Sequence, residues 1–514
     1  MALLLGLDIG TTAVKAGIYK STGRVLAVAA QEYQIAHPGP DRAELDAETY
    51  WTATVTAIRR ALGAAGVDPA RVSSLAVSSQ GETVVAVDAH GRPLGPVIVW
   101  LDNRALAEAR ELAGQFGDAM VYERTGVPAI TPTWTACKLL WWRRHEPELF
   151  AAARHFLLVE DFVIHRLTGR YVTEGGVQST SLLFDIRTGG WWDAMLDAVG
   201  VEPARLPGIV RPGTVVGGLS SDAAEALGLP RSVRVVAGGM DQGAGAVGVG
   251  NVSRGMISES TGGALTLQAS VDHHGGDPTG QTPVYVHSAP DRYLYCPVCP
   301  TGGLALTWFR DQFGADFVAR AERDGSSAYD LLTELAAGVA PGADGLTMLP
   351  HLMGAFSPEY EPEARGAFYG FTLHHGRPHF VRAVLEAVAF MLRRNLELLA
   401  GAGASASEIR SHGGGSRSPL WNQIKADACG LPVVTLEGDA AAVRGDAMIA
   451  GVAAGVFPDL EAACSAMVVV QDRYEPDPTT RAAYDDAYGR YIRLFDALRP
   501  LFSTRGQPLA GPIP

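Results

Sequence analysis

The sequence predicts an α/β fold divided into two domains. The chain has 514 residues, which is too many for one hydrophobic core. Short apolar strands alternate with amphipathic helical segments along its length. A strand, a loop of glycines and hydroxyls, and a second strand occur near the N-terminus and again after the middle of the chain. We place the domains at residues 1–248 and 249–500, followed by a polar tail at 501–514.

The first domain is predicted to open with a β-meander. Three apolar or alternating strands are joined by turns at Gly10 and Gly23, and they cover residues 3–8, 14–19 and 25–30. The first turn contains the groups that a triphosphate needs: the hydroxyls of Thr11 and Thr12, the carboxylate of Asp8 for hydrated Mg²⁺, and Lys15 nearby. It is not a Walker loop. An ordinary hairpin turn is an equally good interpretation of these residues.

Two polar clusters follow predicted strands in the first domain. A helix is predicted over residues 44–62, and buried strands over residues 72–77 and 97–100. Gln80 and Glu82 follow the first of these strands, and Asp102 and Arg104 follow the second. Open α/β sheets place ligands at strand ends, and such a set suits a polyhydroxylated substrate. Trp134, ahead of a predicted helix, could form a wall of the same site. Each residue alone could instead be a cap or a surface ion pair.

The centre of the chain, VVAGGMDQGAGAVGVG at residues 235–250, carries the proposed chemistry. A buried strand over residues 233–237 ends at two glycines, and Asp241 and Gln242 follow before a Gly/Ala-rich helix. Small neighbours let a carboxylate face a ligand closely. We interpret Asp241 as the general base of a phosphoryl-transfer site, and a helix-capping aspartate is the alternative.

The second domain repeats the opening pattern of the first. Residues 254–269 are predicted to form a strand, a turn at Ser260-Thr261-Gly262-Gly263 and another strand. Two such loops would hold the phosphates of a nucleotide. A long amphipathic helix is predicted from residue 380 to Gly401. The run HGGGSRSPLW at residues 412–421 opens another helix, and its glycines would let an adenine lie on the backbone. An Ala/Gly-rich helix is expected at residues 440–455.

Composition excludes some partners. The net charge of −13 argues against nucleic acid and anionic membranes. No apolar run approaches the length of a membrane span, and the apolar start is too short for a signal peptide.

Of five cysteines, only Cys296 and Cys299 have ligand spacing, which is a weak zinc signal. We expect a cytoplasmic protein with free thiols.

Together these segments resemble the FGGY family of carbohydrate kinases over about residues 3–495. The resemblance rests on GLDIGTTAVK at residues 6–15, GGMDQGAGAVGVG, GAFYGFTL, and HGGGSRSPLWNQIKADACGLPVV from His412. It implies two actin-like, ribonuclease-H-like domains, with a sugar in the first and ATP in the second, meeting at an interdomain cleft. It also implies the following roles: Asp241 as base; Asp8 and Asp241 toward Mg²⁺; Gln80, Gly81, Glu82, Asp102, Arg104, Trp134, Asp241 and Gln242 toward the sugar; and Thr11, Thr12, Lys15, Thr261, Gly262, Gly303, Thr307, Gly414, Gly415 and Ser418 toward ATP.

Within the family, TWTACKLLWWRRHEPELF and WLDNR are most similar to xylulokinases, which implies a ketopentose substrate. Two departures stand out. Gly81-Glu82 replaces the usual Met-His of xylulokinases and is similar to the glycerol kinase pattern, and Ser260-Thr261-Gly262-Gly263 replaces the commoner Gly-Thr-Ser-Gly. A glycerol, erythritol or pentitol kinase is therefore an alternative. A non-catalytic sugar or nucleotide sensor is another, although no added DNA-binding domain is apparent. The family also suggests a homodimer.

Overall fold

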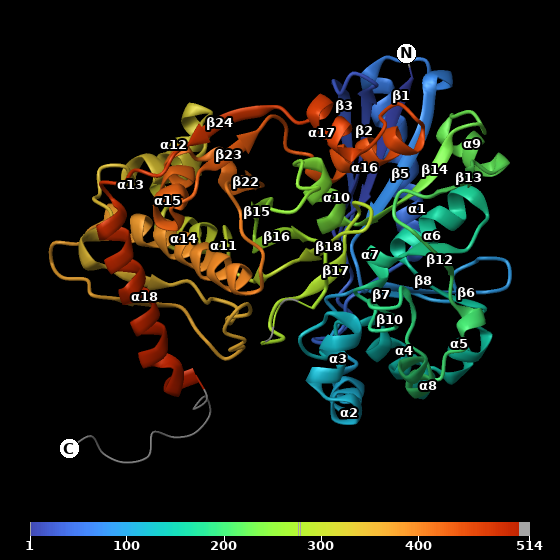
Figure 1. The fold of residues 1–514 in the computed structure, drawn as a ribbon, viewed down its shortest axis with the longest axis horizontal. Helices are drawn as coiled ribbons and strands as arrows, with labels where there is room; N and C mark the ends of the chain where they lie inside the picture. Colours follow the sequence, from blue (N-terminus) through green and yellow to red (C-terminus); the bar gives the residue numbers. More distant parts are fainter. Residues whose placement is uncertain (1, 276, 278, 503–514) are drawn as a thin grey trace. The chain divides into compact units, whose positions relative to one another are not determined.

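The computed structural model describes residues 2–275, 277 and 279–502 of the chain. These residues form two compact units (Figure 1). Of the described residues, unit 1 contains those within Met1–Arg254, Ser270–Tyr295 and Ala440–Val469. Unit 2 contains those within Gly255–Ala269, Cys296–Asp439 and Val470–Pro514. The chain therefore leaves unit 1 and returns to it, whereas the sequence-based boundary at residue 248 divides the chain once.

A six-stranded sheet forms the centre of unit 1. Its strands lie in the order β13 (Val215–Gly218), β14 (Arg234–Met240), β5 (Val72–Ser79), β1 (Leu3–Ile9), β2 (Ala13–Lys20) and β3 (Val25–Glu32). All seven residues of β1 are buried, as expected for a central strand covered on both faces. The predicted meander is confirmed, because β1 pairs antiparallel with β2 and β2 with β3.

Helices and a second sheet surround this core. Helix α1 (Ala47–Ala65) begins at Asp46, whose carboxylate accepts from the Glu48 N–H, and ends at Gly66 in the left-handed conformation. The second sheet has the order β4 (Glu44–Leu45), β7 (Val97–Ile98), β6 (Val84–Val87) and β8 (His155–Leu158). Smaller two-stranded sheets are β9 (Val172–Glu174) with β12 (Gly208–Val210) and β10 (Phe184–Asp185) with β11 (Gly190–Trp191). Strand β17 (Val284–Val286) pairs antiparallel with β18 (Tyr293–Tyr295). The remaining helices of unit 1 are α2 (Leu106–Phe116), α3 (Asp118–Thr125), α4 (Thr135–His145), α5 (Pro147–Ala152), α6 (Val159–Thr168), α7 (Gly175–Gln178), α8 (Asp193–Val199), α9 (Ser221–Leu227), α10 (Asp241–Gly248), α16 (Ala441–Ala453) and α17 (Leu460–Met467).

Helices α10 and α16 pack at backbone distance within unit 1, although almost 200 residues separate them in sequence. A Cβ added at Gly445 would lie 1.9 Å from the carbonyl oxygen of Ala244, and one at Gly248 would lie 1.8 Å from that of Ala441. Only glycine fits such contacts. The Gly/Ala-rich composition of both segments is thus explained by helix–helix contact.

Unit 2 repeats the strand pattern of unit 1. Strands β16 (Leu265–Val271), β15 (Ile257–Thr261), β22 (Ile409–His412), β23 (Val433–Leu436) and β24 (Val470–Tyr474) are hydrogen-bonded in that order, and β19 (Val298–Cys299) pairs with β16. Strand β15 pairs antiparallel with β16 and parallel with β22, as β1 does with β2 and β5. A short pair joins β20 (Thr347–Leu349) to β21 (Ala367–Tyr369). The helices are α11 (Leu304–Phe313), α12 (Ala315–Asp324), α13 (Ala328–Ala336), α14 (Arg377–Gly401), α15 (Pro419–Cys429) and α18 (Arg481–Phe502).

One boundary differs from the sequence-based expectation. Helix α18 continues through Pro500 to Phe502, into the predicted tail, and residues 503–514 lie outside the described part. Among the described helices, none combines the length and hydropathy needed to cross a bilayer.

Candidate active site

Three neighbouring parallel strands of the unit 1 sheet, β1, β5 and β14, place two aspartates at their carboxyl ends. Strand β5 pairs with both β1 and β14, and in this register Ser78 lies opposite Asp8 on one side and Gly239 on the other. Asp241 follows β14 directly and is the first residue of α10. Ligands of α/β sheets bind at the carboxyl ends of parallel strands, so the carboxyl ends of β1, β5 and β14 form the candidate site.

The two aspartates hold their protons more strongly than ordinary carboxyl groups do. Burial raises the pKa of Asp241 to about 7, and the charge of Asp8 adds to this effect. Burial also raises the pKa of Asp8 to about 6, while Lys15, opposite Asp8 in the β1–β2 register, lowers it. A carboxyl group with a pKa near neutrality is suited to accept a proton from a hydroxyl.

A third carboxyl group near this site, Asp446, was not identified from the sequence. It lies on α16 and is fully buried, and its Oδ2 accepts a hydrogen bond of 2.8 Å from Ser78 Oγ. Burial and then the charge of Asp8 raise its pKa. No motif points to it, because Asp446 stands alone in a segment otherwise typical of close helix packing.

A buried glutamate, Glu160, supports the turn before Asp241. Oε1 of Glu160 accepts the backbone N–H groups of Gly238 and Gly239, at 3.0 and 3.3 Å. Burial raises the pKa of Glu160, and the nearby Glu174 raises it further. These hydrogen bonds hold the two glycines in place directly ahead of Asp241.

Glu82 has an unusual backbone conformation that the surrounding side chains stabilise. Its φ of 56° lies in the left-handed region, which is uncommon for a residue with a side chain. Its N–H donates to Thr180 Oγ1, and its carbonyl oxygen accepts from Thr135 Oγ1 and Lys138 Nζ, each at 3.0–3.1 Å. Burial and then the charge of Asp241 raise the pKa of the Glu82 carboxyl group. Glu82 is therefore close enough to Asp241 for the charge of one to affect the pKa of the other.

Gly81 and Gln80, which precede Glu82, are tightly packed. A Cβ at Gly81 would lie 2.5 Å from Thr180 Oγ1, which explains why this position has no side chain. Gln80 is buried and its Nε2 donates to Tyr50 Oη at 2.9 Å. Within the described part, its Oε1 is buried and has no hydrogen-bond partner. A ligand hydroxyl could satisfy this oxygen.

Asp102, Arg104 and Trp134 make contacts inside the protein. Asp102 is fully buried and accepts from the Ala43 N–H and from both Nε and Nη2 of Arg104. Arg104 also binds Glu44 at 2.6 Å. Trp134 Nε1 donates to the Ala129 carbonyl oxygen at 2.9 Å. These contacts order the segments around the site, and direct contact of the three residues with a sugar stays a prediction.

A pocket of about 290 Å³ in unit 2 brings together seven residues predicted to bind a nucleotide. This volume is close to the lower end of the range of about 300–1,000 Å³ that is usual for small-molecule sites. The seven residues are Thr261, Gly262, Gly303, Thr307, Gly414, Gly415 and Ser418. They come from the β15–β16 turn, the start of α11 and the segment between β22 and α15. The other three predicted ATP-binding residues, Thr11, Thr12 and Lys15, belong to unit 1.

The pocket also contains residues that sequence reasoning missed. Tyr329 and Asp330 lie at the start of α13, and Arg417 and Trp421 flank Ser418. Tyr329 Oη lies 3.0 Å from Thr307 Oγ1, which connects α13 to α11. Nothing in the segment around Tyr329 distinguished it from an ordinary helix start.

Thr261 is held by a buried polar network. Its hydroxyl donates to Glu259 Oε2 at 2.7 Å and accepts from Lys425 Nζ at 2.9 Å. Ser411 Oγ also donates to Glu259. Because its hydroxyl is engaged on the protein side, Thr261 would contribute to phosphate binding through the backbone of its turn.

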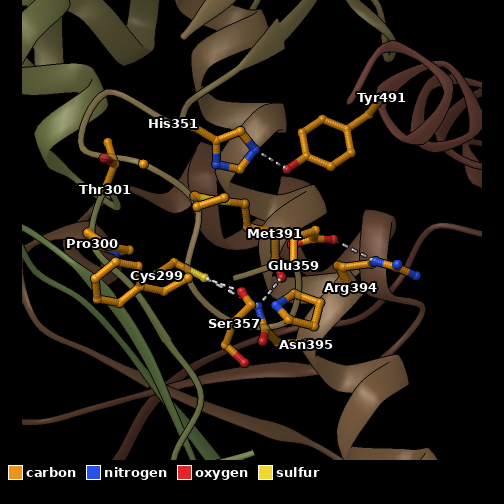
Figure 2. A pocket seen from close by; sticks show the side chains of 14 residues that line it. Cys299, Pro300, Thr301, His351, Ser357, Glu359, Met391, Arg394, Asn395 and Tyr491 are labelled. Carbon is orange, nitrogen blue, oxygen red and sulfur yellow. Dashed lines mark hydrogen bonds and ion pairs between the residues drawn. The ribbon is translucent and has the colours of Figure 1, made fainter. Parts of the chain in front are cut away.

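The thiol of Cys299 is hydrogen-bonded inside the protein. Cys299 lines a separate buried pocket in unit 2, where its thiol donates to the Ser357 carbonyl oxygen and Asn395 Nδ2 donates to its sulfur, both at 3.3 Å (Figure 2). Burial raises the pKa of this thiol to about 12, so the thiolate that a metal needs is disfavoured. No predicted site residue lines this pocket.

Comparison with known proteins adds independent information. Residues 3–248 and 276–454 match the N-terminal and C-terminal domain models of the FGGY family of carbohydrate kinases. A xylulose kinase of Escherichia coli (strain K12) is 30% identical over 98% of this chain and 100% of its own length. A gluconokinase of Bacillus subtilis (strain 168) is 28% identical over 96% of this chain and 95% of its own. The crystal structure of a xylulose kinase from Rhodospirillum rubrum matches with a TM-score of 0.90 and 29% identity, covering 98% of this chain and 100% of the other.

Proposed function

We propose that this chain, which belongs to the FGGY family of carbohydrate kinases, transfers the γ-phosphate of ATP to a terminal hydroxyl of a ketopentose such as xylulose. The observation that carries the proposal is the position of Asp241. It directly follows β14, at the carboxyl ends of the strands where Asp8 also lies, and burial raises its pKa to about 7. The names of the relatives support xylulose or gluconate, and the choice between them rests on the chemistry of the site.

In the proposed reaction, the Asp241 carboxylate accepts the proton of the substrate hydroxyl. The hydroxyl oxygen forms a bond to the γ-phosphorus of ATP while the bond from that phosphorus to the β–γ bridging oxygen breaks, which releases ADP. General-base catalysis of this kind contributes about 10²–10⁴-fold to a rate. Positioning of the phosphates by the glycine-rich turns would supply much of the remainder.

Mg²⁺ fits the carboxylates at these strand ends. Asp8 is buried, and its Oδ1 has no hydrogen-bond partner within the described part. Carboxylate oxygens are the protein ligands that Mg²⁺ prefers. We propose that Asp8, with Asp241 nearby, holds Mg²⁺. The bound ion would neutralise charge on the phosphates.

The charges around Asp241 support a neutral substrate. Asp241 is affected by the charge of Asp8, and Glu82 is affected by the charge of Asp241. The nearby cation Lys138 is fully buried and already donates to the Glu82 carbonyl oxygen. A substrate carboxylate such as that of gluconate would be repelled by the ionised fraction of these groups, whereas sugar hydroxyls can donate to their oxygens in either protonation state.

A polyol kinase is the second candidate, and Glu82 favours it. The carboxyl group of Glu82 lies close enough to Asp241 to feel its charge, and it could accept two hydroxyls of a short polyol. A ketopentose and the corresponding pentitol differ only in the carbonyl group, so the same residues could serve either substrate.

The test is a coupled ADP-release assay with Mg·ATP and D-xylulose, L-xylulose, ribulose, ribitol, xylitol, erythritol, glycerol and D-gluconate. Preference for D-xylulose supports the first candidate, and preference for a polyol supports the second. A higher kcat/KM for gluconate than for every neutral compound would contradict the charge argument. Glu82→Gln should lower kcat/KM for the preferred substrate, while Asp197→Asn, an exposed change on α8, should not.

A further inference from the structure

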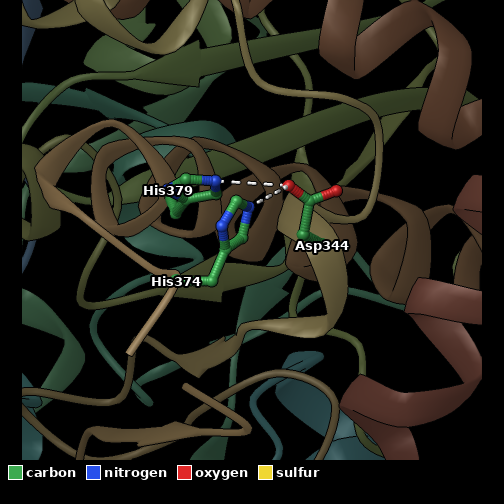
Figure 3. A group of neighbouring side chains, drawn as sticks. All are labelled: Asp344, His374 and His379. Carbon is green, nitrogen blue, oxygen red and sulfur yellow. Dashed lines mark hydrogen bonds and ion pairs between the residues drawn. The ribbon is translucent and has the colours of Figure 1, made fainter. Parts of the chain in front are cut away.

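A histidine–aspartate cluster lies on unit 2 outside the nucleotide pocket. His374 and His379 turn their rings toward the carboxylate of Asp344 (Figure 3). His379 Nε2 lies 3.2 Å from Asp344 Oδ2, and His374 Nε2 lies 3.8 Å from the same oxygen. We propose that Asp344, His374 and His379 form a binding site for a divalent transition-metal ion such as Zn²⁺.

The distances in this cluster match a tetrahedral site. Zinc binds histidine nitrogen and carboxylate oxygen at about 2.0–2.2 Å, so two ligand atoms on one ion are separated by about 3.3–3.6 Å. The separation for His379 is within 0.1 Å of this range, and that for His374 is slightly above it. Among the described residues, this is the one group in which ligand atoms of three such side chains lie within 4.8 Å of one another.

The type of donor indicates a transition metal. Two imidazole nitrogens and one carboxylate suit Zn²⁺, Co²⁺ or Ni²⁺, whereas Mg²⁺ prefers oxygen alone. Three protein ligands leave the fourth position to water. The site would therefore be separate in both place and chemistry from the Mg²⁺ proposed at Asp8 in unit 1.

The structure holds Asp344 in position for this role. It lies in the left-handed conformation (φ 51°) in a turn whose Gly342 N–H donates to Glu386 Oε1 at 2.9 Å. Glu386 is in turn paired with Arg382 in a buried ion pair on α14. His375 adds a second connection, since its Nδ1 accepts from the Thr372 N–H and its Nε2 donates to the Asp344 carbonyl oxygen.

One hydrogen bond must change when the metal binds. His379 Nδ1 accepts from the Gly376 N–H at the start of α14, so the proton of the neutral ring is on Nε2, facing Asp344. Metal binding at Nε2 would move this proton to Nδ1 and release the Gly376 N–H. Gly376 is exposed, so water can replace the lost bond. His374 is exposed, and it can move toward the ion without leaving a packed position.

The experiment uses the full chain after chelator treatment and dialysis, titrated with Co²⁺ and followed by d–d absorption, with Zn²⁺ competition. We expect one ion per chain, and at least tenfold weaker binding in His374→Ala and in Asp344→Asn. The matched control is His273→Ala, because His273 is exposed and lies 2.8 Å from Asp272 but forms no three-ligand group. It should bind Co²⁺ like the wild type.

The same variants separate this site from the kinase reaction. His374→Ala should retain the kcat and KM of the wild type with Mg·ATP, because His374 is outside the nucleotide pocket. Binding of less than one Co²⁺ per chain by the wild type, or equal affinity in wild type and His374→Ala, would overturn the proposal.

Discussion

Lys425 Nζ lies 2.6 Å from Glu259 Oε1 in a fully buried ion pair behind the turn that begins at Thr261. Both partners also bind the Thr261 hydroxyl. A buried pair adds little net stability, because desolvation of the charges offsets their attraction, but the loss of one partner leaves an uncompensated charge. The pair therefore fixes the geometry of a turn that lines the nucleotide pocket.

Replacement of one partner should destabilise the protein more than replacement of both. Lys425→Met should lower the free energy of unfolding by about 3–5 kcal/mol, because Glu259 would remain buried without a cation. The double variant Lys425→Met/Glu259→Leu should recover most of that loss. Denaturant unfolding of both variants measures the difference.

Although the double variant should be stable, it should bind ATP weakly, because it lacks both side chains that bind the Thr261 hydroxyl. We expect a rise of about tenfold in the KM for ATP, with a smaller change in the KM for sugar, on the basis of roughly 1.4 kcal/mol for lost positioning hydrogen bonds. An unchanged KM for ATP in a stable double variant would show that the pair serves folding alone.

Asp241→Asn should lower kcat by about 10²–10⁴-fold, because an amide cannot accept the proton of the attacking hydroxyl. Affinity for ATP should stay within a few-fold, since the predicted adenine contacts lie in unit 2. Steady-state kinetics and calorimetric ATP binding check both statements. Near-normal turnover would be incompatible with Asp241 as the base.

The rate should fall as the pH drops below about 7, because Asp241 must be deprotonated to act as a base. Asp8 contributes to this raised pKa through its charge. Asp8→Asn should therefore move the acidic limb of the kcat/KM profile to lower pH, in addition to reducing the rate. A kcat/KM profile over pH 5–9 tests this shift. An acidic limb at the same pH in wild type and Asp8→Asn would rule out an effect of the Asp8 charge on the pKa of Asp241.

Stability should fall as the pH rises where buried carboxyl groups with raised pKa lose their protons. For Asp446, the folded state binds the proton more tightly than the unfolded state, so its contribution is full below the unfolded pKa of about 3.9 and is lost as the pH rises through the folded value. Asp446→Asn keeps an acceptor for Ser78 and has no proton to lose. Its Tm should match the wild type near pH 4 and exceed it increasingly toward pH 8, as calorimetry can measure.

Much of the fold could be predicted from the sequence because its signals are local. The predicted α/β fold of two actin-like domains is confirmed, and the chain is a carbohydrate kinase. Alternation in residues 3–30 predicted the meander, and helical spacing from residue 380 predicted α14. The glycine pattern around Thr261 and Gly414 predicted residues that the structure brings into one pocket.

The rest could not be predicted, because it depends on contacts between distant segments. Asp446 reaches Ser78 across 368 positions of sequence, and Lys425 reaches Glu259 across 166. Asp446 belongs to no recognisable motif, and the motif that contains Lys425 does not indicate its partner. Tyr329 enters the pocket only because α13 packs against α11, and no spacing in the sequence indicates that contact.

The position of α16 has a consequence for biosynthesis. This helix packs on β1 and α10, so unit 1 needs residues 441–453 to complete its core. At about 5–20 residues per second, a ribosome delivers this helix roughly 20–90 s after β1. During that interval the nascent chain would expose the glycine-lined face of α10 and β1 while most of unit 2 is being made. Unit 1 is therefore begun first but completed late. A chain terminated at residue 439 would lack α16, which packs on β1 and α10 in the core of unit 1.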